Sequence, residues 1–450
     1  MTRLQVLWRL SWPAIIEQVL GTMVSYVDTA MVGVMGAAGT AAVSVNAAPI
    51  WLVQGVLVGV GVGYSVQVSN AVGAGDKERV KRVIRQGFLA ALVCGLLLCA
   101  IYEALGGCIP RWLGAKPDVL PHAVSYMRIY CAALPLGSML AVFSAILRCM
   151  GNSKTPLIFN TAANLLNIVL NFFLIYPTGE FLGITVPRAG MGVEGAALAS
   201  AIALAAAGAG TAWATFRQAG YETSLRDGLA PDAGIISRAA RLALPSAAER
   251  ATVNLGQIAM TALVARLSTV ALAAHQIANT AEGLCYLPAY GIGYAAIALV
   301  GQSVGAREKA DAKAYGNLTG GIGFLLCLVT GTALFLFAPP LASLFNSDAE
   351  VVAQAAMALR IVAFAEPLFA VSIILTNALR GADDVRFPMI VGLVCMWLVR
   401  VPLACLLVLK LDWGLAGIWV AMAIDLTLRG VLCAVRWKRG KWLRLCGLEE

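Results

Sequence analysis

Four acidic residues inside long apolar stretches are the first candidates for chemistry in this chain. They are Asp28, Glu249, Glu282 and Glu366. An ionisable side chain is costly among lipid-facing segments, so each is a functional candidate until a partner explains it. A carboxyl group in apolar surroundings can bind and release a proton or a small cation. Glu17 lies eleven residues before Asp28, on the same helical face, but its place near a stretch end also fits a position among lipid headgroups.

A row of amides forms the second candidate site. Asn160, Asn164, Asn167 and Asn171 follow one another at spacings of four, three and four residues. These spacings put all four side chains on one stripe of a helix. Lipid cannot hydrogen-bond amides, so the stripe predicts a wet cavity or a neighbouring helix on this face. Packing between helices is the alternative explanation.

Two further polar sets fit structural roles. Arg400 lies in one apolar stretch, and Asp425 and Arg429 lie one helical turn apart in the next, so we expect ion pairs among them. For Glu282, a hydrogen bond to His275 or Gln276 is the alternative to a functional role.

Composition places the chain in a membrane. Of its 450 residues, 60% are hydrophobic and only 13% are charged, against about 25% charged in soluble proteins. The chain contains only two histidines and no Cys-x-x-Cys pair, so we expect no metal centre and no cofactor. A membrane-embedded enzyme would need a ligand set or a nucleophile–base pair, and we expect no enzyme here.

The elements that must position these residues are membrane-spanning helices, which need about 20 apolar residues each. Twelve such stretches occur, at 10–33, 41–70, 84–104, 122–147, 156–177, 192–216, 242–266, 271–303, 315–337, 350–379, 388–409 and 414–436. The second and eighth are long enough to require tilt or bending. We expect the first to be an uncleaved span, because Pro13, Glu17 and Gln18 interrupt it.

Basic residues cluster on one side of this topology. The side opposite the termini receives only Arg111, Lys116, Arg188, Arg266 and Lys410. The positive-inside rule therefore predicts both termini in the cytoplasm. The net charge of +9 then needs no nucleic acid, because the basic tail can rest on anionic headgroups.

The chain is internally duplicated. Arg9-Leu-Ser-Trp-Pro-Ala-Ile-Ile-Glu17 returns as Arg241-Leu-Ala-Leu-Pro-Ser-Ala-Ala-Glu249, and the same offset of 232 residues relates the segments that end at Pro135 and Pro367. Tandem repeats in membrane proteins are typical of transporters. We expect an N-lobe over 1–216 with spans 1–6, a cytoplasmic linker over 217–241, a C-lobe over 242–436 with spans 7–12, and a basic cytoplasmic tail over 437–450.

These motifs together resemble the multidrug and toxic compound extrusion (MATE) family of secondary transporters. The resemblance rests on Val27-Asp-Thr-Ala-Met-Val-Gly33, Gly73-Ala-Gly75, Leu147-Arg-Cys-Met-Gly-Asn-Ser-Lys-Thr-Pro156, Gly195-Ala-Ala-Leu-Ala-Ser200, Pro245-Ser-Ala-Ala-Glu249, Ala274-His-Gln-Ile-Ala278 and Ala378-Leu-Arg-Gly-Ala-Asp-Asp384. It implies an all-α membrane protein whose twelve helices form two pseudo-twofold-related six-helix lobes around a V-shaped central cleft. It also implies export of organic cations in exchange for protons or sodium.

The resemblance also implies roles for individual residues. Asp28 matches a coupling aspartate of many prokaryotic members, and Glu249, Glu282 and Glu366 match C-lobe acids of other branches. Asn167 and Asn171 fall on an Asn-x-x-x-Asp cation site, but Asn171 replaces its aspartate, and Ser200 stands where threonine is common. The lost carboxylate weakens a sodium site there, leaves Asp28 able to carry a proton, and favours the C-lobe acids.

We therefore expect an antiporter in the cell membrane that exports drugs or other organic cations by alternating access and works as a monomer. Its partners are small-molecule cations and the bilayer, and the coupling ion is H⁺ or Na⁺. The alternative is a flippase of a lipid-linked or amphipathic molecule, whose cleft would be basic enough to hold phosphate. The candidate residues are mostly acids, which favours the antiporter.

Overall fold

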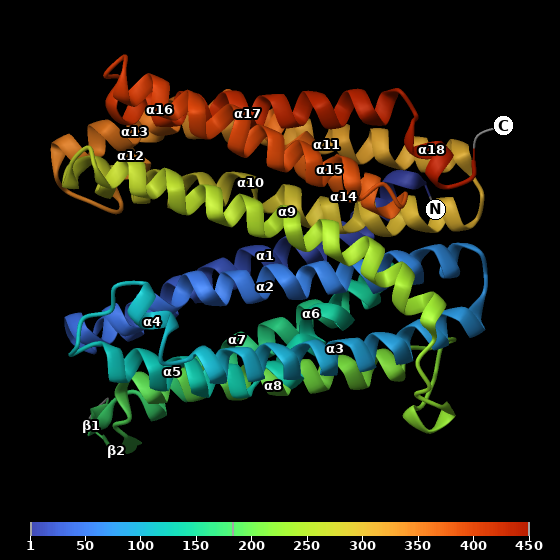
Figure 1. Ribbon diagram of the computed structural model, residues 1–450, viewed down its shortest axis with the longest axis horizontal. Helices are drawn as coiled ribbons and strands as arrows, with labels where there is room; N and C mark the ends of the chain where they lie inside the picture. Colours follow the sequence, from blue (N-terminus) through green and yellow to red (C-terminus); the bar gives the residue numbers. More distant parts are fainter. Residues whose placement is uncertain (1, 182–183, 449–450) are drawn as a thin grey trace. The chain divides into compact units, whose positions relative to one another are not determined.

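Long helices dominate the structure, a computed structural model that describes residues 2–181 and 184–448. Residues 1, 182 and 183 of the expected N-lobe and residues 449–450 of the expected tail lie outside it. The first half of the chain forms α1 (Arg3–Gly33), α2 (Gly36–Gly73), α3 (Lys77–Leu105), α4 (Ile109–Trp112), α5 (Leu120–Ala132), α6 (Leu134–Cys149), α7 (Lys154–Leu174), β1 (Pro177–Phe181), β2 (Ile184–Ala189), α8 (Gly192–Phe216) and the 3-10 turn η1 (Leu225–Asp227) (Figure 1).

The second half is helical in all its described elements. It forms α9 (Ala233–Ala265), α10 (Thr269–Gly305), α11 (Lys309–Leu336), α12 (Ala338–Ser343), α13 (Ala349–Ala363), α14 (Glu366–Gly381), α15 (Arg386–Val394), the π-helical turn η2 (Cys395–Arg400), α16 (Val401–Leu409), α17 (Gly414–Lys438) and α18 (Trp442–Leu445). Each of the twelve expected spans coincides with a long helix, a bent helix pair or, for 388–409, the continuous α15–η2–α16 segment. Helix α9 begins at Ala233, inside the segment expected to be a linker.

Length and composition support a membrane location for most of these helices. Eight helices in the described part of the chain are long and apolar enough to cross a membrane, and two bent pairs bring the number to ten. Helices α1 and α9 fall outside this group, although they are 31 and 33 residues long. Both contain charged side chains and an internal proline, Pro13 or Pro245, at corresponding repeat positions.

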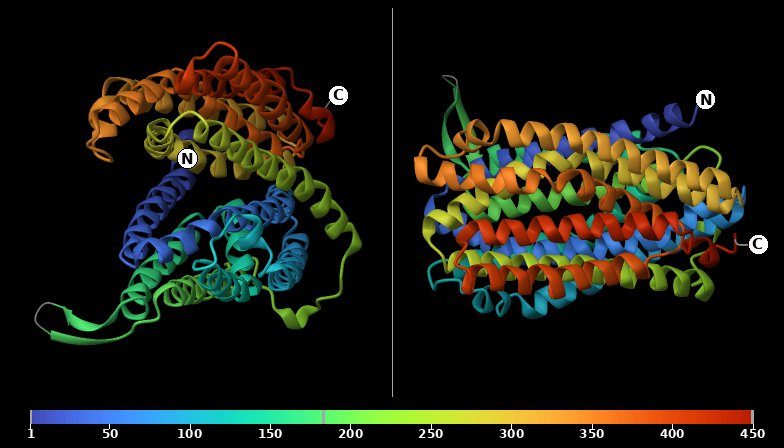
Figure 2. Two further views of the ribbon diagram at one scale, coloured as in Figure 1. Left: turned by 60° about the vertical axis from the view of Figure 1, so that its left-hand side comes forward. Right: turned by 90° about the horizontal axis from the view of Figure 1, so that it is seen from above.

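The chain forms two compact units, which we call the N-unit and the C-unit. The N-unit comprises Val19–Val68 and Asp76–Ala243, and the C-unit comprises Met1–Gln18, Ser69–Gly75 and Leu244–Glu450. Helices α1 and α2 each contribute to both units. In the N-unit, helices α3, α5, α6, α7 and α8 pack against one another (Figures 1 and 2). In the C-unit, α10, α11, α13, α14 and α17 form the main packing.

Two spans expected as single helices are each broken at a repeated proline. Helices α5 and α6 meet at 56°, and α13 and α14 meet at 57°. Pro135 and Pro367 lie in the first turn of α6 and α14, where the missing N–H costs no helical hydrogen bond. The break places Glu366 at the first position of α14.

Helix ends show the same repeat. After α6 the chain turns through Gly151 at φ 89°, and after α14 it turns through Asp383 at φ 60°. Gly75 and Arg307 are related in the same way, with φ of 71° and 60°. Glycine adopts this left-handed conformation without strain, whereas arginine does not. The second copy therefore has the same turn geometry with a residue other than glycine at each turn.

Glycines allow helices to touch within each unit. A Cβ atom on Gly63 would lie 2.6 Å from the carbonyl oxygen of Ala239 in the N-unit. In the C-unit a Cβ on Gly291 would lie 2.5 Å from a side-chain atom of Ile15. These glycines are therefore close-packing positions.

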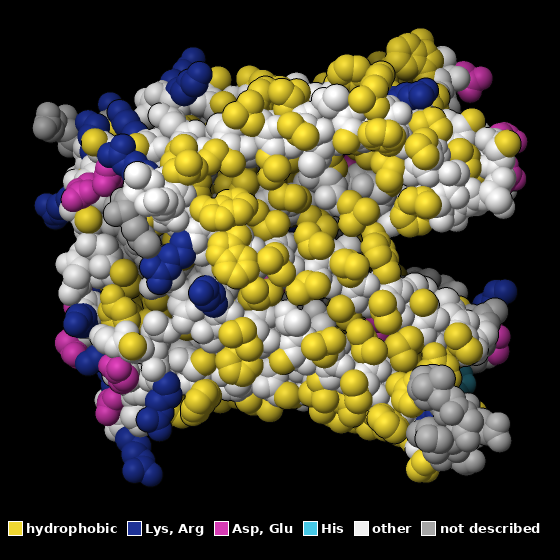
Figure 3. All heavy atoms as spheres, turned by 180° about the vertical axis from the view of Figure 1, so that it is seen from behind, with side chains coloured by type: hydrophobic (Ala, Val, Ile, Leu, Met, Phe, Trp, Pro, Cys, Tyr) yellow, Lys and Arg dark blue, Asp and Glu magenta, His cyan; other side chains and the backbone are white. Residues whose placement is uncertain are grey.

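The connection between α7 and α8 forms an antiparallel hairpin. Strands β1 and β2 pair Gly179 with Val186, with an irregular register near Pro177, and project away from the helices of the N-unit (Figure 2). Within each unit, lysine and arginine side chains gather mostly at one end, and hydrophobic side chains cover the middle (Figure 3). This distribution is the one that the positive-inside argument predicts for each half.

Candidate functional site

The N-unit joins Asp28 to the amide stripe through a chain of hydrogen bonds. The Asn171 amide of α7 donates to Asp28 Oδ1 of α1. A second hydrogen bond runs from Asn171 Nδ2 to Asn167 Oδ1 at 3.1 Å, and Asn167 Nδ2 donates to Ser200 Oγ of α8 at 3.1 Å. Three helices thus present one connected polar chain, which we call the Asp28 chain.

A cavity of about 260 Å³ lies against the Asp28 chain. Asp28, Asn167 and Ser200 line it, and so do two further members of the amide stripe, Asn160 and Asn164. Three of the four amides therefore face a cavity, which is one of the two surroundings expected for the stripe. Of the four amides, Asn171 is fully buried and connects the lining to Asp28.

The C-unit holds Glu249 in an ion pair. Arg380 Nη2 of α14 donates to Glu249 Oε2 of α9 at 2.8 Å, and the two side chains are 5% and 17% exposed. Arg250, the next residue of α9, lies over the ring of Tyr290 at 5.6 Å. The charge of Glu249 is thus compensated by a buried guanidinium group.

Glu282 and Glu366 lie deeper in the C-unit. Glu282 is 2% exposed and lines a cavity together with Glu249. Glu366 is fully buried and is not among the residues that line the cavity. The structure therefore brings Glu249 and Glu282, but not Glu366, to one cavity. His275, a suggested partner of Glu282, packs its ring against Trp419 at 5.6 Å.

The predicted ion pairs of Asp425 with Arg400 and Arg429 are confirmed. Arg429 Nε donates to Asp425 Oδ1 at 2.8 Å, and Arg400 Nη1 lies 3.6 Å from Asp425 Oδ2. Asp425 is fully buried. Arg400 is the last residue of η2, and a π-helical turn often marks a functional position because it redirects the side chains that follow.

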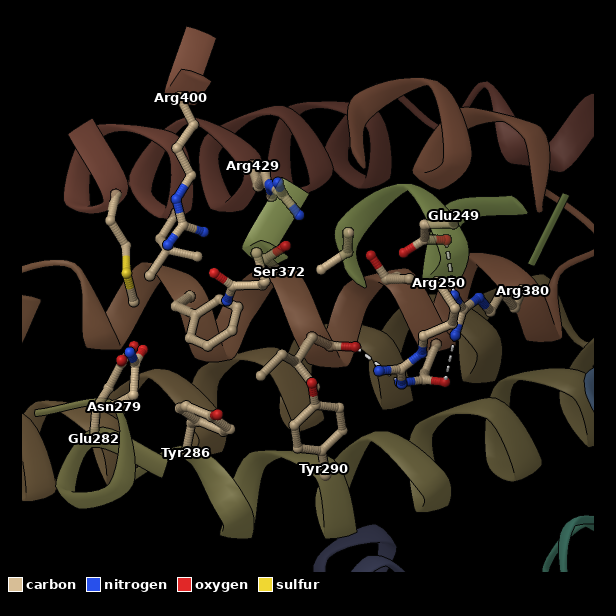
Figure 4. Close-up of a pocket in the computed structure, with 18 residues that line it drawn as sticks. Glu249, Arg250, Asn279, Glu282, Tyr286, Tyr290, Ser372, Arg380, Arg400 and Arg429 are labelled. Carbon is tan, nitrogen blue, oxygen red and sulfur yellow. Dashed lines mark hydrogen bonds and ion pairs between the residues drawn. The ribbon is translucent and has the colours of Figure 1, made fainter. Parts of the chain in front are cut away.

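The C-unit cavity has a volume of about 130 Å³, and most of its charged lining residues are basic. Four arginines, Arg250, Arg380, Arg400 and Arg429, line it together with the two glutamates. Figure 4 shows Arg400 and Arg429 pointing into the cavity from the α15–α17 side, opposite Glu282, Tyr286 and Tyr290 of α10. In the sequence the acids are the prominent candidates, and Arg400 and Arg429 are expected only to form structural ion pairs. Arg250 was missed, although it directly follows Glu249.

Metal ligation has no support in the described residues. They contain no group of three or more His, Cys, Asp or Glu side chains placed to hold a metal ion. The eleven cysteines are free thiols, and only Cys108 among them is exposed. The chemistry that these sites can support is the binding of cations, protons and, in the C-unit, anions.

Comparison with known proteins assigns the chain to a family. The MatE family profile matches residues 13–173 and 245–406, one match in each half. The "Probable multidrug resistance protein NorM" of Thermotoga maritima is 28% identical over 435 residues, covering 96% of this chain and 92% of the relative. The "Multidrug resistance protein MdtK" of Yersinia pestis (strain Pestoides F) is 30% identical over 443 residues, covering 95% and 93%.

Solved structures share the fold. A MATE crystal structure in the bent conformation matches with a TM-score of 0.88 at 22% identity, over 98% of this chain and 95% of that one. A MATE structure in complex with MaL6 matches with a TM-score of 0.90 at 22% identity, over 98% and 96%. The predicted fold class is thereby confirmed. The chain belongs to the MatE family of multi-pass membrane transporters, and it is a transporter and not an enzyme.

Proposed function

We propose that this protein exports organic cations from the cell in exchange for protons, by alternating access, and that Asp28 carries the proton. Relatives named as multidrug resistance proteins support the choice of substrate class. The observation that carries the proposal is the Asp28 chain, in which a carboxylate on a cavity wall is joined by hydrogen bonds to amide and hydroxyl groups of two other helices.

The order of events follows from charge. An ionised Asp28 attracts a cationic substrate on the cytoplasmic side. A proton from outside then neutralises the carboxyl group, so the attraction ends and the substrate leaves. The protonated acid can remain enclosed at small cost, because a neutral group avoids the large penalty of a bare charge in low dielectric.

The contacts of Asp28 favour a proton over sodium. Asn171 donates its amide N–H to Asp28 Oδ1, and an N–H group cannot act as a ligand for a cation. In the C-unit, Glu249 already compensates Arg380, so releasing it for ion binding would leave a buried guanidinium group unpaired. We therefore place the coupling step at Asp28, with Glu249, Glu282 and Glu366 shaping the C-unit. The protein resides in the cell membrane with both termini in the cytoplasm and is functional as a monomer.

Efflux from proteoliposomes tests this proposal. Wild type, Asp28→Asn, Glu366→Gln and the double variant Glu249→Gln/Arg380→Gln are loaded with ethidium and placed under a proton gradient, then under a sodium gradient. The proton gradient should drive efflux by wild type and by both C-unit variants, but not by Asp28→Asn. Full efflux by Asp28→Asn would remove Asp28 from coupling. If wild type moves no dye under either gradient, export of organic cations is contradicted, and a flippase becomes the better hypothesis.

A further inference from the structure

The C-unit cavity contains more positive than negative charge. Arg250, Arg380, Arg400 and Arg429 line it, whereas the acids that line it or pair with its arginines are Glu249, Glu282 and Asp425. Glu249 compensates Arg380, and Asp425 is shared between two arginines. This arrangement leaves guanidinium charge that the carboxylates around the cavity do not match.

Arg400 and Arg429 also have N–H donors without a hydrogen-bond acceptor among the described residues. Arg400 Nε and Nη2 and Arg429 Nη2 are buried and have no hydrogen-bond partner there. The Arg400 side chain is only 3% exposed, and its 3.6 Å contact with Asp425 is too long for a hydrogen bond. A buried donor without an acceptor costs roughly 1–3 kcal/mol, and more when it is charged. An acceptor that entered the cavity would remove this cost.

We propose that the cavity binds an anionic oxygen group, a carboxylate or a phosphate, carried by an amphipathic ligand. Arg400 and Arg429 approach the cavity from the same side (Figure 4), and guanidinium forks match the oxygens of carboxylate and phosphate. The ligand body would contact Tyr286 and Phe369, whose rings pack edge to face at 5.2 Å on the wall. A transported zwitterion or anion is thereby added to the cations proposed above, so this inference rests on the proposed export function.

The structure opposes a purely structural reading of these arginines. One buried aspartate suffices to pair one arginine, and Arg429 makes the short hydrogen bond with Asp425. Arg400, the last residue of the π-helical turn η2, makes a longer contact of 3.6 Å with the same aspartate and lines the cavity. A helix turn that directs an arginine into a cavity already rich in arginine is costly for stability unless an anion binds there.

A matched pair of probes tests the proposal directly. Diethylaminocoumarin carboxylic acid and its ethyl ester differ by one negative charge on the same aromatic body. Fluorescence anisotropy measures their dissociation constants with the full-length protein in phosphatidylcholine nanodiscs, without any ion gradient. Wild type should bind the acid at least tenfold more tightly than the ester. Equal affinity for the two probes, or no binding of the acid, would overturn the proposal.

Variants locate the site. Arg429→Gln should lower the acid-to-ester preference at least fivefold and leave ester binding unchanged, and Arg400→Gln provides a second test should the first variant fail to fold. Arg360→Gln is the matched control, because Arg360 is exposed and its guanidinium lies over Phe335, outside the cavity. A preference that persists in folded Arg429→Gln and Arg400→Gln would place the anion elsewhere and contradict the proposal.

Two comparisons identify the source of the anionic group and distinguish failure of the anion site from failure of the proposed cation export. If added phosphatidylglycerol abolishes binding of the coumarin acid, the anionic group belongs to a lipid headgroup. If binding of the acid persists, the anionic group belongs to a soluble ligand. Both results support the anion site. Proton-driven ethidium efflux without any acid preference would leave cation export standing and refute the anion site. A preference for the acid without ethidium efflux would support the anion site and refute cation export.

Discussion

At the scale of residues, the two halves of the protein use acids differently. Asp28 accepts a hydrogen bond from the Asn171 amide, and its protonation changes the charge of its cavity. Glu249 is held by Arg380, so any change in its charge disturbs a buried pair. This difference, and not the number of acids in each half, is our reason for placing ion coupling at Asp28.

The hydrogen bond from the Asn171 amide to Asp28 should contribute to proton-driven transport. Asn171→Ala removes the hydrogen bond to Asp28 Oδ1, and a hydrogen bond to a charged group contributes about 1.5–3 kcal/mol. We expect proton-driven ethidium efflux to fall about tenfold or more, since 1.4 kcal/mol corresponds to about a factor of ten. Initial efflux rates measure the effect. Asn152→Ala is the control, because Asn152 bonds Thr155 and Gln218 outside the cavity; an equal loss in both variants would refute a specific role.

The Glu249–Arg380 pair should matter more for stability than for coupling. Glu249→Gln leaves Arg380 buried and unpaired, and breaking a buried pair from one side costs about 3–5 kcal/mol. The double variant Glu249→Gln/Arg380→Gln should recover most of that loss. Thermal unfolding of the purified protein, followed by tryptophan fluorescence, completes the double-mutant cycle. Additive effects of the two single substitutions would show that the pair contributes no coupling energy.

Residue types that are costly in a membrane could be identified from the sequence, but their charge balance could not. The acids, the amide stripe and the Arg400–Asp425–Arg429 set all follow from residue types and spacing in the sequence. The basic lining of the C-unit cavity does not, because it depends on α9, α14, η2 and α17 meeting at one place. Arg250 and Arg380 have ordinary sequence contexts, and only the tertiary structure places them on one wall.

At the scale of elements, close packing of helices depends on glycines, which have no Cβ atom at the contact. A Cβ on Gly316 of α11 would lie 1.9 Å from the Trp437 ring, which is stacked on Trp442 at 4.5 Å and bonded to Asn317 at 3.0 Å. The ring cannot move without losing these contacts.

Gly316→Ala should therefore destabilise the protein by about 1–3 kcal/mol through overpacking. Gly321→Ala in the same helix is the matched control, because nothing lies within 4 Å of its Cβ. Alanine is the better helix former by about 1 kcal/mol, so this variant should be neutral or more stable. Melting temperatures of the two purified variants should move in opposite directions or differ clearly. Equal melting temperatures would contradict the packing argument.

The twelve spans were predictable and the breaks within them were not. The length of an apolar stretch identifies a membrane span, but it does not show whether the helix bends within the span. The repeated prolines Pro135 and Pro367 were visible, yet proline in a membrane helix produces a kink only when packing satisfies the freed backbone groups. Here both copies bend by nearly the same angle, which shows that the duplication preserved the geometry as well as the sequence.

At the scale of the whole molecule, topology is testable through one thiol. Cys108 lies between α3 and α4 and is the exposed cysteine of the chain. The proposed topology puts it outside the cell. A membrane-impermeant maleimide added to intact cells should label wild type and fail to label Cys108→Ala, as seen by gel shift. Labelling of wild type only after lysis would invert the topology and place both termini outside.

The most direct test of the account measures protons moved by substrate. Proteoliposomes that contain a trapped pH-sensitive dye are exposed to an ethidium gradient without any imposed ion gradient. Wild type and Glu249→Gln/Arg380→Gln should show an ethidium-dependent change of internal pH, and Asp28→Asn should show none. Proton movement by Asp28→Asn at the wild-type rate would contradict the assignment of coupling to Asp28.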